Sequence, residues 1–114
     1  MEKPNHLYIL WTNGDLDTSL RMVMMYATNS MLHQWWERVT VIVWGAPAKL
    51  AAENGQVREA IQVAMHAGVE FSACVACARQ LGVIENLQAL GMEVKGWGEP
   101  LTELLQNNEK LITV

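Results

Sequence analysis

Five short runs of apolar, β-favouring residues alternate with helical segments along the whole chain. The runs cover residues 7–11, 39–44, 69–73, 92–95 and 111–114. Within them apolar residues follow one another rather than standing at every second position, which is typical of parallel strands covered by helices on both faces. We therefore expect an α/β domain with three α/β/α layers and about five parallel strands. Several strand orders are compatible with this alternation.

The first predicted helix is apolar on nearly all sides. Asp15 is a typical N-cap after the Asn13-Gly14 turn, and the helical pattern continues to about Trp36. Helical spacing gives a core stripe made of Leu16, Leu20, Val23, Ala27, Met31 and Trp35. Further large apolar residues lie off that stripe, namely Met22, Met25, Tyr26, Leu32 and Trp36. Because such a helix is buried on more than one side, we expect a subunit contact here.

The other helical segments carry their own start and stop signals. Pro47 suits a first helical turn, Asn54-Gly55 marks a break, and Gly68 is typical of the position just after a helix end. A third helical segment is predicted over residues 74–90 and a fourth over residues 99–108. These signals agree with helical crossovers between parallel strands.

The composition excludes several classes of protein. The chain has 114 residues, of which 51% are hydrophobic, so we expect a single domain over residues 1–114 and no intrinsic disorder. The formal net charge is −4 and Lys and Arg do not cluster, which argues against nucleic acid or an anionic membrane as a partner. Because the chain lacks a membrane-spanning run and signal-peptide features, a cytoplasmic location is expected. Five Trp and seven Met are many for a small monomer, and they indicate a ligand pocket or a subunit interface.

Candidate binding residues follow the predicted strands, because ligands of an open parallel sheet collect beyond the carboxyl ends of its strands. Three of the loops at that edge contain glycine, which lets the backbone bend tightly or approach a ligand closely. The candidate partner-binding residues in these loops are Asn13, Gly14, Gly45, Gly96, Trp97 and Gly98. The loops hold neither a nucleotide-binding glycine pattern nor a Ser/His/Asp combination, so we predict no cofactor and no hydrolase activity.

Cys74 and Cys77 are the main candidates for chemistry. Cys74 directly follows the third predicted strand and would lie at a helix N-terminus, where free N–H groups and the helix dipole favour a nucleophilic thiolate. Cys77 would lie one turn further along the same side, as a secondary site residue. The alternative is that both cysteines are small buried packing residues, which suits Cys77 better than Cys74.

A metal site is not predicted. One pair of cysteines supplies two ligands, whereas a structural zinc site uses four, and no second pair follows. His6, His33 and His66 are isolated on predicted strand or helix bodies. A metal site shared between subunits is the alternative.

The order and spacing of these motifs resemble the DsrE/DsrF-like sulfur relay family, in particular its small single-domain members of the YchN/TusD type. Three segments carry the resemblance: residues 69–83 with both cysteines, residues 90–101 with Gly-Trp-Gly, and the opening strand and loop at residues 7–14. The resemblance covers essentially the whole chain. It implies a flavodoxin-like fold with five parallel strands, assembled into homo-oligomers that are trimers or hexamers.

The resemblance also implies a function. Relatives in sulfur relay systems carry sulfur as a persulfide on a cysteine at this junction, which corresponds to Cys74, and hand it to the next protein. We therefore expect a sulfur carrier or sulfurtransferase whose partners are sulfur donor and acceptor proteins. Cys77 is an addition to the one-cysteine pattern of some relay subunits. Two alternatives are a disulfide oxidoreductase or redox sensor that uses both cysteines, and a non-catalytic assembly subunit.

Overall fold

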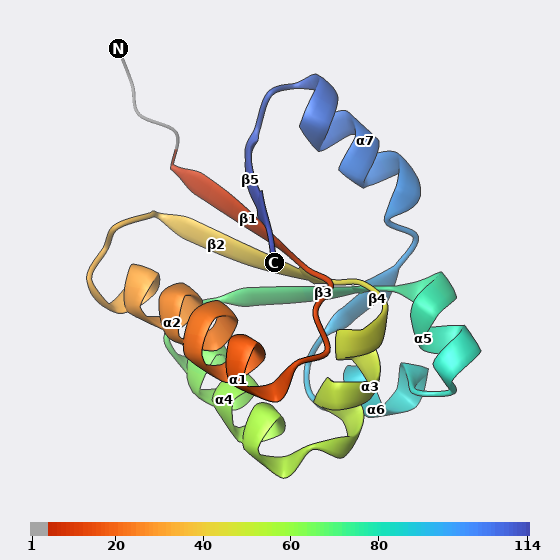
Figure 1. Cartoon of the computed structure of the whole chain (residues 1–114). Helices are drawn as coiled ribbons and strands as arrows, with labels where there is room; N and C mark the ends of the chain where they lie inside the picture. The colour runs from red at the N-terminus through yellow and green to blue at the C-terminus, as the bar shows by residue number, and fades with distance from the viewer. Residues whose placement is uncertain (1–4) are drawn as a thin grey trace.

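The computed structural model describes residues 5–114, and its centre is a sheet of five parallel strands (Figure 1). The strand order is β4-β3-β2-β1-β5. Each strand lies within one residue of a predicted run. The strands are β1 (His6–Trp11), β2 (Arg38–Val43), β3 (Glu70–Cys74), β4 (Glu93–Lys95) and β5 (Lys110–Thr113). The predicted α/β/α fold with a five-stranded parallel sheet is confirmed.

The strand order distributes the helices unevenly over the two faces of the sheet. From β1 to β4 each crossover steps to the neighbouring strand in one direction, so right-handed connections place all their helices on one face. The chain then returns from β4 to β5 past β1, in the opposite direction, and this return carries α7 (Gly98–Gln106) on the other face. The expectation of helices on both faces therefore holds with one correction. Within residues 5–114, α7 is the single helix on its face and covers only part of it.

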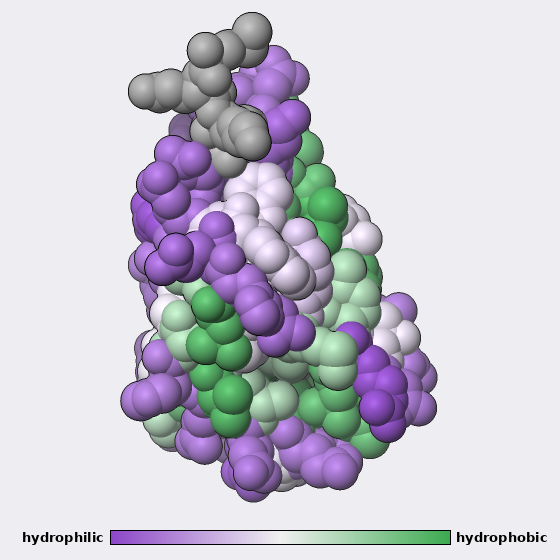
Figure 2. All heavy atoms as spheres, turned by 90° about the vertical axis from the view of Figure 1, so that its left-hand side faces the viewer, coloured by the Kyte–Doolittle hydropathy of each residue, from purple (hydrophilic) through white to green (hydrophobic). Residues whose placement is uncertain are grey.

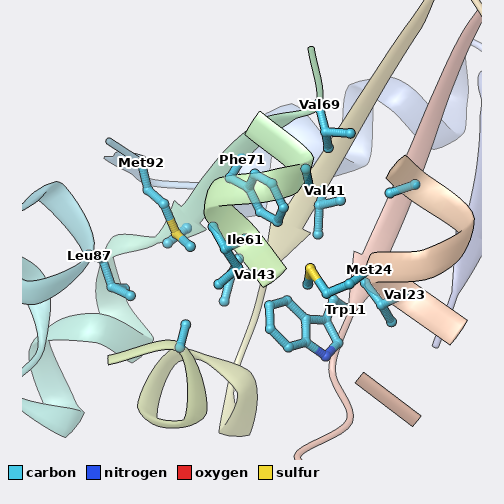
Figure 3. Close-up of a cluster of buried hydrophobic side chains, with 14 of the residues drawn as sticks. Trp11, Val23, Met24, Val41, Val43, Ile61, Val69, Phe71, Leu87 and Met92 are labelled. Atoms are coloured by element: carbon cyan, nitrogen blue, oxygen red, sulfur yellow. The ribbon is translucent and has the colours of Figure 1, made fainter. Parts of the chain in front are cut away.

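The main hydrophobic core lies on the many-helix face. Along β1 the side chains alternate, so that Leu7, Ile9 and Trp11 are buried there while His6 and Tyr8 lie on the α7 face. The core extends through the helices that connect β1, β2, β3 and β4. Figure 3 shows members of this core from several elements, among them Trp11, Val23, Met24, Val41, Val43, Ile61, Phe71, Leu87 and Met92.

The first crossover helix differs from the prediction in two ways. It consists of α1 (Leu16–Thr18), a π-helical turn η1 (Ser19–Met24) and α2 (Met25–Leu32). The π-turn holds an extra residue, which shifts the side chains that face the core, so Val23 and its neighbour Met24 are both buried. The helix also ends at Leu32 rather than Trp36. Trp35, expected in the core stripe, lies beyond that end with its side chain 57% exposed.

The remaining helices begin and end at the predicted signals. They are α3 (Ala46–Glu53), α4 (Gly55–His66), α5 (Val75–Leu81) and α6 (Ile84–Ala89). Asn54 separates α3 from α4, and its side-chain Oδ1 accepts a hydrogen bond of 3.0 Å from the Val57 N–H. Gly68 follows α4 with φ of 108°, a left-handed conformation that favours glycine.

The Asn54 cap gives a stability prediction. Asn54→Ala removes the acceptor of the Val57 N–H and should lower the free energy of unfolding by about 1 kcal/mol, the usual worth of an N-cap. Asn54→Asp keeps a capping oxygen and should remain close to the wild-type protein. Urea unfolding of the three proteins measures the difference, and equal losses in both variants would show that the cap does not stabilise α4.

Candidate functional site

Cys74 is the last residue of β3 and the N-cap of α5. In the β3–β4 register Cys74 pairs with Lys95, and Ser72 pairs with Glu93. Because side chains alternate along a strand, Cys74 and Ser72 lie on the same face of the sheet. This is the α7 face, so the thiol lies at the carboxyl edge of the sheet but away from the main core.

A small apolar cluster surrounds the thiol. Cys74, Ile42 and Trp97 are its buried members, and Cys74 and Trp97 are each 5% exposed. Partly buried residues from the sheet, the loops, α5 and α7 pack against them: Tyr8, Leu10, Trp44, Cys77, Leu101 and Leu104. The thiol is therefore covered by side chains rather than open at a loop edge. A reaction at Cys74 requires one of these side chains to move.

Cys77 lies beside Cys74 one turn into α5. The two thiols pack in the same small cluster, and Cys77 also lies close to the Gly45 backbone. Burial raises the pKa of Cys77, the Gly45 hydrogen bond lowers it, and the neighbouring Cys74 raises it further, with a net upward shift. The upward shift of its pKa favours the protonated thiol of Cys77.

Trp97 closes the other side of the thiol. Its ring nitrogen Nε1 donates a hydrogen bond of 2.8 Å to the Ser72 hydroxyl, and that hydroxyl donates one of 2.8 Å to Glu93. The Lys95 ammonium group lies 4.7 Å from the centre of the Trp97 ring and 3.4 Å from the Glu93 carboxylate. Trp97 is thus held in place by polar contacts to Ser72 and Lys95.

The structure brings some of the predicted loop residues to the cysteines and places others elsewhere. Gly45 contacts Cys77, while Gly96 and Gly98 flank Trp97. Asn13 and Gly14 instead form a turn, in which the Asn13 carbonyl accepts hydrogen bonds from the Trp11 ring and the Ser19 hydroxyl. Gly14 lines a separate hollow of about 340 Å³ beside α3.

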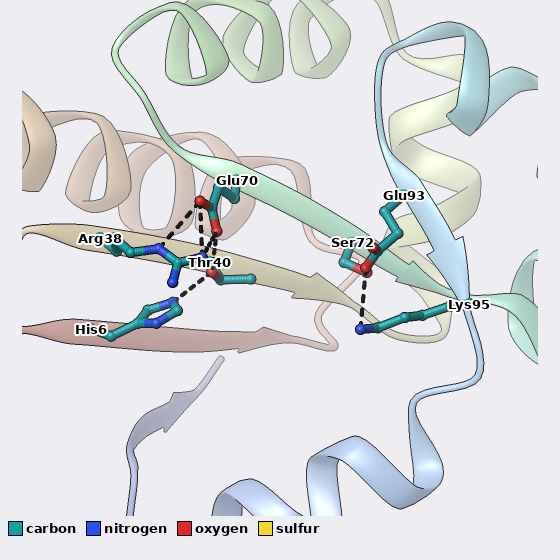
Figure 4. Close-up of polar contacts among 7 residues, drawn as sticks. All are labelled: His6, Arg38, Thr40, Glu70, Ser72, Glu93 and Lys95. Carbon is teal, nitrogen blue, oxygen red and sulfur yellow. Dashed lines mark hydrogen bonds and ion pairs between the residues drawn. The ribbon is translucent and has the colours of Figure 1, made fainter.

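Sequence reasoning missed a polar groove on the α7 face. Its volume is about 380 Å³, and polar residues of four neighbouring strands line it. The groove residues are His6, Tyr8, Arg38, Thr40, Glu70, Phe71, Ser72, Glu93, Lys95 and Trp97. Figure 4 shows those that take part in its polar contacts, namely His6, Arg38, Thr40, Glu70, Ser72, Glu93 and Lys95. A signal for it was present in the sequence, because polar residues stand at every second position at Arg38 and Thr40, Glu70 and Ser72, and Glu93 and Lys95.

One end of the groove contains a connected network of hydrogen bonds. The Arg38 guanidinium contacts both carboxylate oxygens of Glu70, the closer at 2.8 Å, and the Thr40 hydroxyl donates to Glu70 at 3.0 Å. Thr40 Oγ1 lies 2.7 Å from His6 Nε2. Thr40 uses its one hydroxyl hydrogen in the hydrogen bond to Glu70. The hydrogen bond between His6 and Thr40 is therefore donated by the N–H of His6 Nε2.

The network changes the acidity of its members. The hydrogen bonds from Arg38 hold the pKa of Glu70 below its ordinary value, against the effect of burial. Burial and the Arg38 charge lower the pKa of His6. At neutral pH this end of the groove therefore contains a carboxylate, a guanidinium and an uncharged imidazole.

The lowered pKa of Glu70 gives a prediction about acid stability. As the pH falls, Glu70 becomes protonated at a higher pH in the unfolded chain than in the folded protein. The contribution of ionised Glu70 to the free energy of unfolding is therefore lost as the pH falls below the ordinary value of 4.5 and through the lower pKa of the folded state. Glu70→Gln and Arg38→Gln should both make the free energy of unfolding less dependent on pH in this range. Urea unfolding over a series of pH values measures it. An unchanged pH dependence in both variants would contradict the role of the pair.

Two further properties concern the described part of the chain. Between residues 5 and 114, no three His, Cys, Asp or Glu side chains are grouped so that they could hold a metal ion. Over the same residues, no helix has the length and apolar character needed to cross a membrane.

Comparisons with known proteins place the chain in a family. No match was found among the curated proteins. A solved structure with the same fold is that of a conserved protein of unknown function from Bacteroides thetaiotaomicron, with 39% sequence identity and a TM-score of 0.94 over 96% of this chain and 95% of that chain. The model of the DsrE/DsrF-like family matches residues 8–114. The chain therefore belongs to the DsrE/DsrF-like family, as its motifs indicated.

Proposed function

We propose that the protein is a sulfur carrier that holds a persulfide on Cys74 and passes the sulfur to a partner thiol. The observation that carries the proposal is the paired thiol at the carboxyl edge of the sheet. Cys74 lies in an apolar cluster there, and Cys77, one turn further along α5, packs against that cluster. Membership of the DsrE/DsrF-like family supports the same assignment.

The transfer balances without an oxidant or a reductant. The Cys74 thiolate attacks the outer sulfur of a donor persulfide, the S–S bond of the donor breaks, and the donor leaves as a thiolate. The acceptor thiolate then attacks the outer sulfur on Cys74, and Cys74 returns to a thiolate. Because its raised pKa favours the protonated form, Cys77 is a weaker competing nucleophile than a thiolate would be.

The environment of Cys74 suits a carrier that must protect its cargo. The first N–H groups of α5 lie next to Cys74 and carry partial positive charge, which stabilises the negative charge of a bound persulfide. The apolar cover keeps water and other thiols from a bound persulfide. These conditions favour a reducing cytoplasm as the compartment, because an oxidising one would convert the pair to a disulfide.

The position of Cys77 favours one second candidate function. Two free thiols that pack in the same cluster can form a disulfide, with Cys77 as the resolving thiol. A disulfide oxidoreductase or redox sensor would need both cysteines, whereas a sulfur carrier needs Cys74 alone.

Intact-mass measurement after treatment with a persulfide donor tests the proposed function. Wild-type protein and Cys77→Ser should each gain one sulfur atom, and Cys74→Ser should gain none. Reduction should remove the added sulfur in both positive cases. Sulfur uptake by Cys74→Ser together with none by Cys77→Ser would overturn the assignment. A reversible disulfide that disappears in either single variant, without sulfur uptake, would support the redox function instead.

We further propose that the protein forms a homo-oligomer, a trimer or hexamer, through the first crossover helix. Exposed apolar side chains gather on this helix, its following turn and α4, namely Met22, Met25, Leu32, Trp35 and Val63. Figure 2 shows hydrophobic atoms among hydrophilic ones on the side that lies at the left of Figure 1. A surface of this kind is typical of protein contacts.

Light scattering after size-exclusion chromatography tests the assembly. The wild-type protein should have the mass of an oligomer, and Met25→Lys should shift it toward the monomer because a charge would be buried in the contact. Leu105→Lys is the matched control, since Leu105 is equally large and exposed but lies on α7. A wild-type monomer at micromolar concentration would contradict the proposal.

A further inference from the structure

The polar groove ends at the residue that covers the thiol. Trp97 lines the groove and also packs against Cys74 in the apolar cluster. The volume of about 380 Å³ lies in the range of small-molecule sites. A molecule in the groove is therefore separated from the Cys74 sulfur by the Trp97 side chain.

The charges of the groove indicate what kind of molecule it accepts. Two ion pairs line it, Arg38 with Glu70 and Lys95 with Glu93, and Figure 4 shows them on opposite sides of the polar face. An anion would meet two carboxylates there and a cation would meet two positive groups. A zwitterion can place its carboxylate against one of the cations and its ammonium group against one of the carboxylates.

The same charged groups hold Trp97 in place. Lys95 lies against the Trp97 ring, and Glu93 accepts the hydrogen bond of the Ser72 hydroxyl to which Trp97 donates. A ligand carboxylate that draws Lys95 away, or an ammonium group that binds Glu93, therefore weakens the contacts of Trp97. Binding in the groove is thereby coupled to exposure of the thiol.

The segment around Trp97 has room to move. Gly96 and Gly98, the two neighbours of Trp97, have open space beside them. A Cβ atom added at either glycine would meet no atom within 4 Å. The following helix α7 has no fully buried residue. Trp97 can therefore leave the cluster without disrupting the main core on the other face.

We propose that the groove binds a small zwitterionic thiol compound of the α-amino-acid class, and that Trp97 is the positioning residue that admits it to Cys74. This inference rests on the proposed function and names the class of its small-molecule sulfur acceptor, which is such a thiol, or of its sulfur donor, which is the persulfide of such a thiol. Cystine, the disulfide of cysteine, is a probe for it. The Cys74 thiolate attacks one cystine sulfur, the S–S bond breaks, a mixed disulfide forms on Cys74, and cysteine leaves as a thiolate.

The first experiment tests Trp97 through the rate at which iodoacetamide alkylates Cys74. All proteins carry Cys77→Ser, so that intact mass reports one thiol. Ser72→Ala removes the hydrogen bond of Trp97 and should raise the rate about fivefold, the factor expected for one net hydrogen bond. Ser19→Ala is the matched control, because Ser19 is a buried serine that accepts a hydrogen bond of 3.1 Å from another buried tryptophan, Trp11. An unchanged rate in Ser72→Ala, or an equal rise in Ser19→Ala, would overturn the role of Trp97.

The second experiment tests the class of ligand. In the Cys77→Ser background, the rate of mixed-disulfide formation with cystine is divided by the rate with the uncharged bis(2-hydroxyethyl) disulfide. This ratio should exceed the same ratio measured with free cysteine as the attacking thiol. Glu93→Gln and Arg38→Gln should each lower the ratio of the protein. Both disulfides reach Cys74 only after the Trp97 side chain has moved, so the effect of that movement cancels in the ratio. The ratio therefore measures how well the groove recognises the charged groups of cystine. A ratio equal to that of free cysteine would overturn the inference.

The outcomes separate this inference from the proposed function. Sulfur uptake by Cys74 from inorganic polysulfide, without any preference for cystine, would overturn the groove assignment and leave the carrier function. A preference for cystine without sulfur uptake would remove the carrier function and keep the groove as a thiol-ligand site.

Discussion

The handedness of the crossovers is the constraint on which the rest of this structure depends. Three successive connections step along the sheet in one direction, so their helices must all cover one face. The connection from β4 to β5 passes in the opposite direction and supplies only α7 to the other face. One face therefore holds the main core, and the other is free to hold the thiol cluster and the polar groove.

The sparsely covered face combines protection with access. Cys74 lies under Trp97 and α7, and this cover consists of the small apolar cluster together with a hydrogen bond to Ser72 and the contact with Lys95. This cluster is much smaller than the main core, and the hydrogen bond within it contributes only about 1 kcal/mol. A thiol on the main-core face would be reached only by partial unfolding.

The similarity to a solved structure over nearly the whole of both chains establishes the fold and the family rather than a reaction. Function has to be argued from the site, and here the site has two parts. The first is the cysteine pair at the carboxyl edge of the sheet. The second is the charged groove, which extends from His6 and Arg38 at the amino ends of the strands to Trp97 beside the thiol.

The sequence by itself determined the elements and the position of the main thiol. Local signals were sufficient because the Asn54 cap, the positive-φ Gly68 and the Cys74 strand–helix junction depend on neighbouring residues alone. The π-turn in the first helix was not predicted, since it depends on how that helix packs. Tertiary structure decided the strand order, the partial cover by α7, and the meeting of His6, Thr40 and Glu70 in one network. These residues belong to three strands far apart in the chain, and only the sheet register brings them together.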